Sequence, residues 1–218
     1  MTRPSIPAYS YEKDPAEIYR QSFSIVRAEA DLAHVPEDLR PVAIRLIHAC
    51  GMTDLPRDLA WSGNASEAAQ AAFMNNAPVL CDVEMVVHGI IRSRLPSGCD
   101  VICTLNDAGV PDLSKRLKTT RSAAAVDLWH DRLQGAIVAV GNAPTTLFRL
   151  LEIIANGGPR PALVLGFPVG FVGASESKDA LISNPFDLPF LALKGRRGGS
   201  AMAAAAVNAL AAGLPEEA

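Results

Sequence analysis

Histidine is the side chain best suited to acid–base chemistry at neutral pH, and the sequence contains four. His48 lies in a predicted helix over residues 37–50, which we expect to end at Gly51, and Arg45 precedes it by three residues. Side chains at this spacing emerge on one face of a helix. A fixed cation there favours the neutral imidazole, whose N–H is then available for transfer. The alternative is a histidine that only interacts with the helix dipole.

The other histidines are weaker candidates. His34 in a helix connection and His130 beside two charged residues are expected at the surface, whereas His88 follows a predicted strand and is expected to be partly buried and hydrogen-bonded. No two histidines have metal-ligand spacing, and the four cysteines include no Cys-x-x-Cys pair. We therefore expect no metal site and four free, mostly buried thiols.

Three loops combine glycines or hydroxyls with cations at predicted helix starts, an arrangement that suits carboxylates or phosphates. The predicted binding residues in these loops are Arg121, Ser122, Lys178 and Arg197. The alternatives are a threonine N-cap at 119 or 120 and an exposed turn with solvated arginines at 195–200. The segment 165–174 is glycine-rich but does not match G-x-G-x-x-G, so we do not expect nucleotide binding there. Taken together, the loops indicate a ligand with many carboxylates or phosphates.

Short apolar runs, nearly continuous rather than alternating, predict the strands that carry these loops. They cover residues 77–81, 101–105, 136–140, 162–165 and 190–193. Helix signals fill the gaps, with starts at Asp14-Pro15 and Gly141-Asn142 and an alanine-rich helix at 202–212. The predicted fold class is therefore α/β, a three-layer helix/sheet/helix arrangement with a mainly parallel sheet of about five strands. Ligands bind such sheets beyond the carboxyl ends of the strands, where the loops above lie.

Composition limits the class of protein. With 49% hydrophobic and 20% charged residues, the 218-residue chain can bury one core, so we expect a single domain over 1–218 with a frayed tail at 215–218. The net charge of −3 argues against nucleic acid as a partner. No signal-like or membrane-length apolar stretch is present, so we expect a cytoplasmic protein that does not bind membranes.

Over nearly its whole length the sequence resembles the precorrin-8X methylmutase (precorrin isomerase) family of cobalamin biosynthesis. The resemblance rests on segments in the same order and at the same spacing as in the family, at 19–23, 25–32, 48–51, 78–82, 120–124, 141–145, 166–174, 176–178 and 195–200. It implies an isomerase that moves a methyl group from C-11 to C-12 of a polycarboxylate, tetrapyrrole-derived macrocycle, precorrin-8X, and gives hydrogenobyrinate. The methyl group is already on the substrate, so no external donor or cofactor is expected.

The resemblance also implies roles for particular residues. His48 matches the histidine that gives or takes the proton, and Ser22 and Arg45 match substrate contacts. The family further implies a homodimer with the site near the subunit interface.

Three alternatives stay open at this point. The first is the same isomerisation on the cobalt-containing substrate, cobalt-precorrin-8. The second is a non-catalytic protein that binds a corrinoid, against which His48 argues. The third is a phosphate- or nucleotide-binding α/β module, for which adenine nucleotides would raise the melting temperature.

Overall fold

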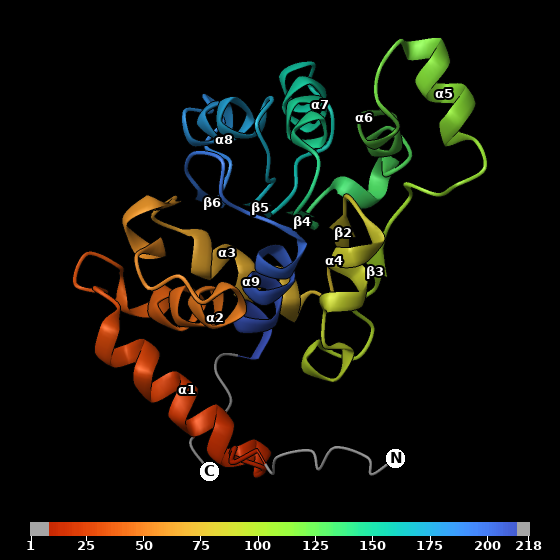
Figure 1. The fold of residues 1–218 in the computed structure, drawn as a ribbon. Coiled ribbons are helices and arrows are strands. Elements are labelled where there is room, and N and C mark those ends of the chain that lie inside the picture. The colour runs from red at the N-terminus through yellow and green to blue at the C-terminus, as the bar shows by residue number, and fades with distance from the viewer. Residues whose placement is uncertain (1–8, 213–218) are drawn as a thin grey trace, which may run out of the picture.

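The computed structural model describes residues 9–212, and a six-stranded sheet runs through it in the order β1-β6-β5-β4-β2-β3 (Figure 1). The strands are β1 (Leu59–Trp61), β2 (Val79–Cys81), β3 (Val101–Ile102), β4 (Ile137–Val140), β5 (Leu163–Gly166) and β6 (Phe190–Leu193). All neighbours are parallel except β1 and β6. The predicted, mainly parallel sheet is thus confirmed. The tail at 215–218 lies outside the described residues.

Two details of the sheet differ from the prediction. Strand β1 was not predicted, because it has three residues, of which only Leu59 is buried, and pairs antiparallel with β6 at the edge of the sheet. Strand β3 is shorter than the predicted 101–105. Thr104 lies past its end, where Oγ1 donates to the carbonyl of Ala125 at 2.8 Å.

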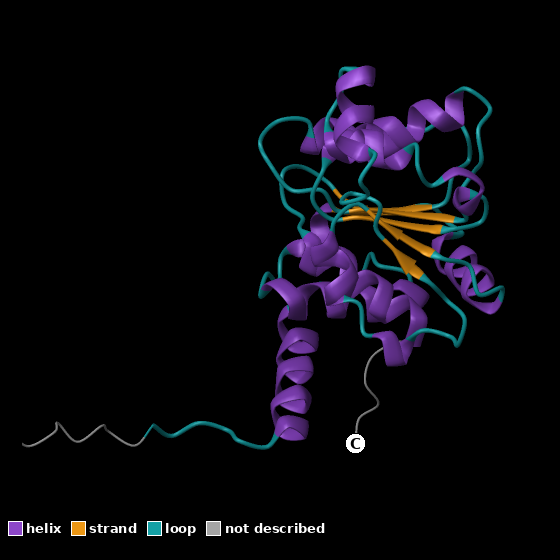
Figure 2. Cartoon of the chain, turned by 90° about the vertical axis from the view of Figure 1, so that its right-hand side faces the viewer, coloured by secondary structure: helices purple, strands orange, loops and turns teal. Residues whose placement is uncertain are grey.

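The central strands are buried on both faces, which explains their continuous apolar runs. In β4, Ile137 and Ala139 belong to one hydrophobic core, and Val138 and Val140 belong to the other. Figure 2 shows the sheet between two layers of helices. The three-layer prediction is therefore confirmed.

Helices of both layers flank this sheet (Figure 1). One side carries α1 (Pro15–Glu29), α2 (Arg40–Cys50), α3 (Ala65–Met74), α4 (Glu84–Gly89) and α9 (Ser200–Ala212). The other carries α5 (Val110–Leu117), α6 (Arg121–Val126), α7 (Pro144–Ala155) and α8 (Ala174–Ile182). Short 3₁₀ turns are η1 (Glu37–Leu39), η2 (Leu55–Asp58), η3 (Arg92–Arg94) and η4 (His130–Leu133). None of the described helices is both long and apolar enough to cross a bilayer.

Helix α9 is the alanine-rich helix of the prediction, and it begins two residues earlier than expected, at Ser200. Its small side chains let neighbours approach closely: a Cβ added to Gly89 would lie 2.7 Å from Ala204 Cβ. Asn208 of α9 accepts from the N–H of Ile91 at 2.8 Å and donates to the carbonyl of Gly89 at 3.0 Å. This buried amide therefore fixes the turn that leads into η3.

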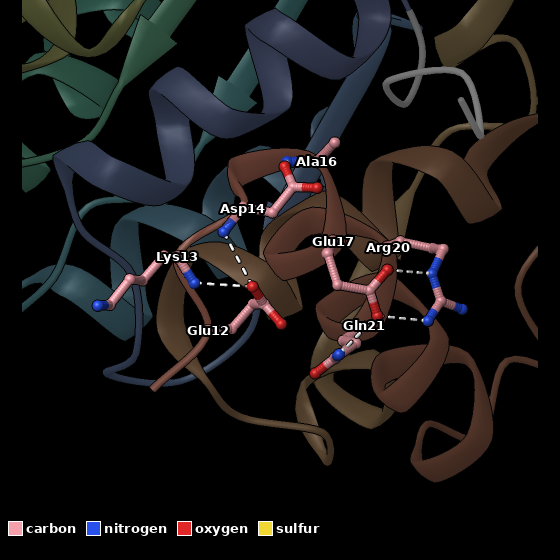
Figure 3. Close-up of polar contacts among 7 residues, drawn as sticks. All are labelled: Glu12, Lys13, Asp14, Ala16, Glu17, Arg20 and Gln21. Carbon is pink, nitrogen blue, oxygen red and sulfur yellow. Dashed lines mark hydrogen bonds and ion pairs between the residues drawn. The ribbon is translucent and has the colours of Figure 1, made fainter. Parts of the chain in front are cut away.

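Helix α1 projects from the body of the molecule (Figure 2) and begins as predicted at Asp14, whose carboxylate accepts from the N–H of Ala16. In Figure 3 the carboxylate of Glu17 meets the guanidinium of Arg20, with contacts of 2.7 and 2.5 Å. These local contacts support the exposed first turns of α1. Its second half is anchored to the body through the buried side chains of Phe23 and Val26.

Candidate active site

The loops after β2 and β4 are joined by a buried carboxylate. Asp82 accepts hydrogen bonds of 2.8–2.9 Å from the N–H groups of Gly141, Asn142 and Ala143. Burial raises the pKa of Asp82 above its ordinary value, although the three donors oppose this. The backbone donors before α7 are thus used by the protein itself, which leaves no phosphate cradle at this loop.

The loops after β5 and β6 are joined by a buried ammonium. Lys178 of α8 donates to the carbonyl of Pro168 at 3.0 Å and to that of Arg197 at 2.7 Å. Its side chain is fully buried, which lowers its pKa to about 8. Gly198 crosses so close to the first loop that an added Cβ would lie 2.3 Å from the carbonyl oxygen of Phe167. Lys178 therefore holds two of the loops that the sequence predicted to bind substrate.

Arg197 connects these loops to the chain that follows α2. Its guanidinium contacts the Sδ atom of Met52 at 3.8 Å and forms ion pairs with Asp54, at 2.9 Å, and Asp58. Gly51 ends α2 in the left-handed conformation, with φ 71°, as the sequence predicted. The last turn of α2 therefore lies beside the carboxyl edge of the sheet.

His48 occupies that last turn, and α1 covers it. The Nδ1 atom of His48 lies 2.8 Å from the Oγ atom of Ser22. The rings of Phe23 and Tyr19 lie against the imidazole, with centroid distances of 4.8 and 5.7 Å. The side chain is half-buried in this setting. Two residues predicted from the family resemblance, Ser22 and His48, are thus in direct contact.

Electrostatics favour the neutral form of His48. Partial burial lowers its pKa below the ordinary 6.5, and the charge of Arg45 lowers it further. The sequence predicted the effect of Arg45, but the larger contribution of burial comes from the packing of α1. A neutral imidazole that accepts from the Ser22 hydroxyl at Nδ1 carries its proton on Nε2, where it can be donated.

Arg45 is an unusual cation. Its side chain is only 7% exposed, and its Nη1 atom has no hydrogen-bond partner among the described residues. Burial lowers its pKa, and so does the charge of Arg94 in η3. A buried guanidinium whose charged neighbour is a second cation is costly unless an anion joins it. The arrangement suits a carboxylate supplied by a ligand.

The remaining predicted residues, Arg121 and Ser122, begin α6 in the opposite helical layer. Arg121 donates to the carbonyl of Leu105 at 3.2 Å and to the side chain of Asn106 at 3.1 Å, and it is exposed. Thr120 is the N-cap, one of the two alternatives that the sequence left open, and it also bonds Thr145 at the start of α7. Arg121 and Ser122 are therefore held apart from the group around His48.

The other histidines and the cysteines follow the predictions with one exception. His34 and His130 are exposed as expected, but His88 is also exposed, so its expected partial burial is wrong. It lies in the last turn of the short helix α4, where its side chain faces solvent rather than packing under the sheet edge. All four cysteines are free thiols, two buried and two partly buried. Within residues 9–212, no cluster of three His, Cys, Asp or Glu side chains is placed to hold a metal ion.

Sequence reasoning gave no role to several residues that build this site. Asp82 and Arg94 are two of these residues. Tyr19 lies three residues before Ser22 and four before Phe23, so it neighbours both on the surface of the helix, and this spacing was the available signal. The long-range pairing of each residue became visible only in the folded chain.

A protein-family model and sequence relatives with the same activity in their names match most of this chain. The family model described as precorrin-8X methylmutase matches residues 17–212. A precorrin-8X methylmutase from Pseudomonas aeruginosa is 56% identical over 201 residues, covering 92% of this chain and 97% of the relative. A cobalt-precorrin-8 methylmutase from Priestia megaterium is 34% identical, covering 90% of this chain and 87% of the relative.

The fold agrees with the sequence match. A crystal structure of the precorrin-8X methylmutase from Thermus thermophilus superimposes with a TM-score of 0.80 at 39% identity, covering 89% of this chain and 93% of that one. The range matched by the family model includes the Ser22–His48 pair, Arg45 and all four loop residues predicted to bind substrate. The chain therefore belongs to the precorrin-8X methylmutase family of methyl-shifting isomerases.

Proposed function

We propose that this chain converts precorrin-8X to hydrogenobyrinate by moving a methyl group from C-11 to C-12 of the macrocycle, in cobalamin biosynthesis. The bond from C-11 to the methyl carbon breaks as the bond from C-12 forms, so neither an external methyl donor nor a redox partner is required. The observation that carries the proposal is the neutral, Ser22-bonded His48 beside the buried Arg45 with its unpartnered Nη1. An acid next to an unpaired cation suits a macrocycle with carboxylate side chains.

His48 acts in this proposal as the hydrogen-bond donor. In the tautomer that carries its proton on Nε2, the Nδ1 atom accepts from the Ser22 hydroxyl across the 2.8 Å contact. The Nε2–H group then donates a hydrogen bond to a ring nitrogen near C-11 and keeps its proton, because full transfer from a neutral imidazole would leave an imidazolate. This withdraws electron density from the conjugated system and lowers the barrier to a [1,5]-sigmatropic shift. The rings of Tyr19 and Phe23 hold the imidazole in place and shield part of it from water.

The cations have different roles in the proposal. Arg45 binds one substrate carboxylate directly, and Arg121 and Ser122 bind the macrocycle from the opposite layer. Lys178 and Arg197 act through the loops that they hold, since the ammonium of Lys178 is fully buried on two carbonyls and Arg197 is paired with two aspartates. The sequence alone predicts the four loop residues as equivalent substrate contacts. In this proposal Arg121 and Ser122 bind the substrate, whereas Lys178 and Arg197 position the loops.

The test is single-turnover absorption spectroscopy on mixing purified protein with precorrin-8X. We expect the spectrum of the substrate to change to that of a corrin with wild-type protein, and the change to be slowed at least about 100-fold by His48→Ala. Wild-type rates in His48→Ala would refute the acid role. Binding of precorrin-8X with an unchanged spectrum in the wild type would instead indicate a corrinoid-binding protein without this activity.

The alternative substrate is cobalt-precorrin-8. The higher identity to the Pseudomonas enzyme, 56% against 34% for the Priestia enzyme, favours the metal-free substrate. Parallel incubations with each substrate separate the two, and we expect the higher kcat/KM with precorrin-8X. A higher value with the cobalt-containing substrate would reverse the assignment.

We further propose that residues 1–218 form a single domain that acts as a homodimer in the cytoplasm. Ile18 and Ile25 of the projecting α1 are 46% and 54% exposed, and they lie two turns apart on this helix. An apolar stripe of this kind is typical of a subunit interface. The cytoplasm is proposed on a separate observation: four free thiols suit a reducing compartment. Light scattering should give twice the chain mass, and Ile25→Ser should shift the protein towards monomer. A fully active wild-type monomer would exclude the dimer.

A further inference from the structure

The loop between β5 and α8 exposes two apolar side chains at its tip. Phe171 is 86% exposed and Val172 is 89% exposed, the highest values among the large hydrophobic residues that the structure describes. The chain before the loop is buried, from Leu163 in β5 to Phe167, and Val169 within the loop is 45% exposed. Exposed apolar pairs of this kind at the edge of a site are typical of ligand contacts.

The tip is held in a defined place by the residues around it. Gly170 and Gly173 flank it with φ values of 146° and 79°, which the other residue types rarely adopt. The N–H of Gly170 donates to the carbonyl of Arg196 at 3.2 Å. At the other end, a Cβ on Gly173 would lie 3.3 Å from Pro144 Cβ, at the start of α7. The backbone therefore presents Phe171 and Val172 outward on a fixed base.

This tip borders the site described above. Its base meets the loop after β6 at Arg196, and the next residue, Arg197, contacts Met52, four residues after His48. The guanidinium of Arg196 lies over the Phe171 ring, 5.5 Å from its centroid. An apolar surface and a cation are thus side by side at the carboxyl edge of the sheet.

We propose that Phe171 and Val172 pack against the flat face of the substrate macrocycle, while Arg196 meets a carboxylate at its rim. This inference rests on the proposed function. A conjugated ring with acidic side chains has an apolar face and an anionic edge, and the tip offers an apolar surface with a cation beside it. Packing covers the apolar side chains and holds the ring in register with His48, so these are positioning residues rather than proton carriers.

The experiment is a titration of each purified variant with hydrogenobyrinate, followed by protein fluorescence. We expect Phe171→Ser to raise Kd about tenfold or more, because it removes the aromatic contact that becomes buried when the macrocycle binds. Phe171→Leu keeps an apolar side chain and should restore most of the affinity. Met74→Ser is the matched control: Met74 is 79% exposed but ends α3, ahead of the amino end of β2. In turnover, Phe171→Ser should raise KM more than it lowers kcat.

Two results would overturn the inference. One is an equal Kd for Phe171→Ser, Met74→Ser and wild type. The other is a shift of Phe171→Ser from dimer to monomer in light scattering, which would make the tip a subunit contact. Failure of the wild type itself to bind hydrogenobyrinate would be a different result, since it would remove the proposed function and this inference with it.

Discussion

Ser22 Oγ contacts His48 Nδ1 at 2.8 Å across the packing of α1 against α2, and the two residues are 26 positions apart in the sequence. A hydroxyl has a proton to give, whereas a carboxylate in its place would pull the imidazole towards its charged form. The serine therefore orients the ring without charging it. This explains why a projecting, largely exposed helix is part of the site.

Removal of that hydroxyl should affect catalysis more than binding. In Ser22→Ala the Nδ1 atom loses its partner, so both tautomers are populated and the Nε2–H donor is present for only part of the time. We expect kcat to fall about 10- to 100-fold with KM little changed, because part of the acid–base contribution of His48 is lost. Steady-state kinetics give both values. Ser22→Thr, which keeps the hydroxyl, is the control, and an unchanged kcat in Ser22→Ala would exclude the orienting role.

The pH dependence of kcat/KM follows from the lowered pKa of His48. Since the neutral imidazole is the active form, kcat/KM should fall as the pH falls, and the midpoint of this decline should lie below 6.5, the ordinary pKa of histidine. Arg45 contributes to the lowering, so the decline in Arg45→Met should begin at higher pH than in the wild type. A pH–rate series measures both. Activity that falls as the pH rises through 6.5 would show that the charged imidazole is the active form.

Arg45→Met should separate stability from function. The substitution removes a buried charge that has an unpartnered Nη1 and a cationic neighbour, and methionine fills much of the same volume. Without ligand we expect Tm to rise by about 2–4 °C, the shift that about 1 kcal/mol produces in a domain of this size. KM should rise at least about tenfold, because the carboxylate loses its cation. Calorimetry and kinetics on the same samples test this, and a lower Tm would mean that Arg45 serves the fold.

Lys178→Met should destabilise the protein in a pH-dependent way. The substitution leaves the carbonyls of Pro168 and Arg197 without their donor, and each such loss costs about 1–3 kcal/mol. In the wild type the pKa of Lys178 is about 8 when folded and 10.5 in its ordinary state, so between these values the unfolded chain binds more protons. Wild-type stability should gain from this group as the pH rises from 8 to 10.5.

The rise in the free energy of unfolding between pH 8 and 10.5 identifies the buried ammonium when denaturation is measured at a series of pH values. Lys178→Met should lack it, whereas Lys194→Met, a change at an exposed lysine, should keep it. Equal pH dependence of unfolding in all three proteins would show that the ammonium of Lys178 does not titrate in this range.

The sequence was enough to predict the layered fold. Doubly buried strands must be continuous apolar runs, so five of the six strands were visible, and the caps at Asp14 and Gly51 marked the ends of α1 and α2. It also determined that His48 and Arg45 share a helical face, because 3.6 residues per turn places positions i and i+3 together. These are local properties, set by neighbours in the chain.

The partners that these residues contact depend on how the chain packs in three dimensions. The contact of Ser22 with His48, the loop clamps of Asp82 and Lys178, and the approach of Arg94 to Arg45 all join segments that are distant in sequence. The edge strand β1 was not predicted for a related reason, since three residues, of which one is buried, form no pattern until β6 pairs with them. Burial and pairing depend on packing, which periodicity does not encode.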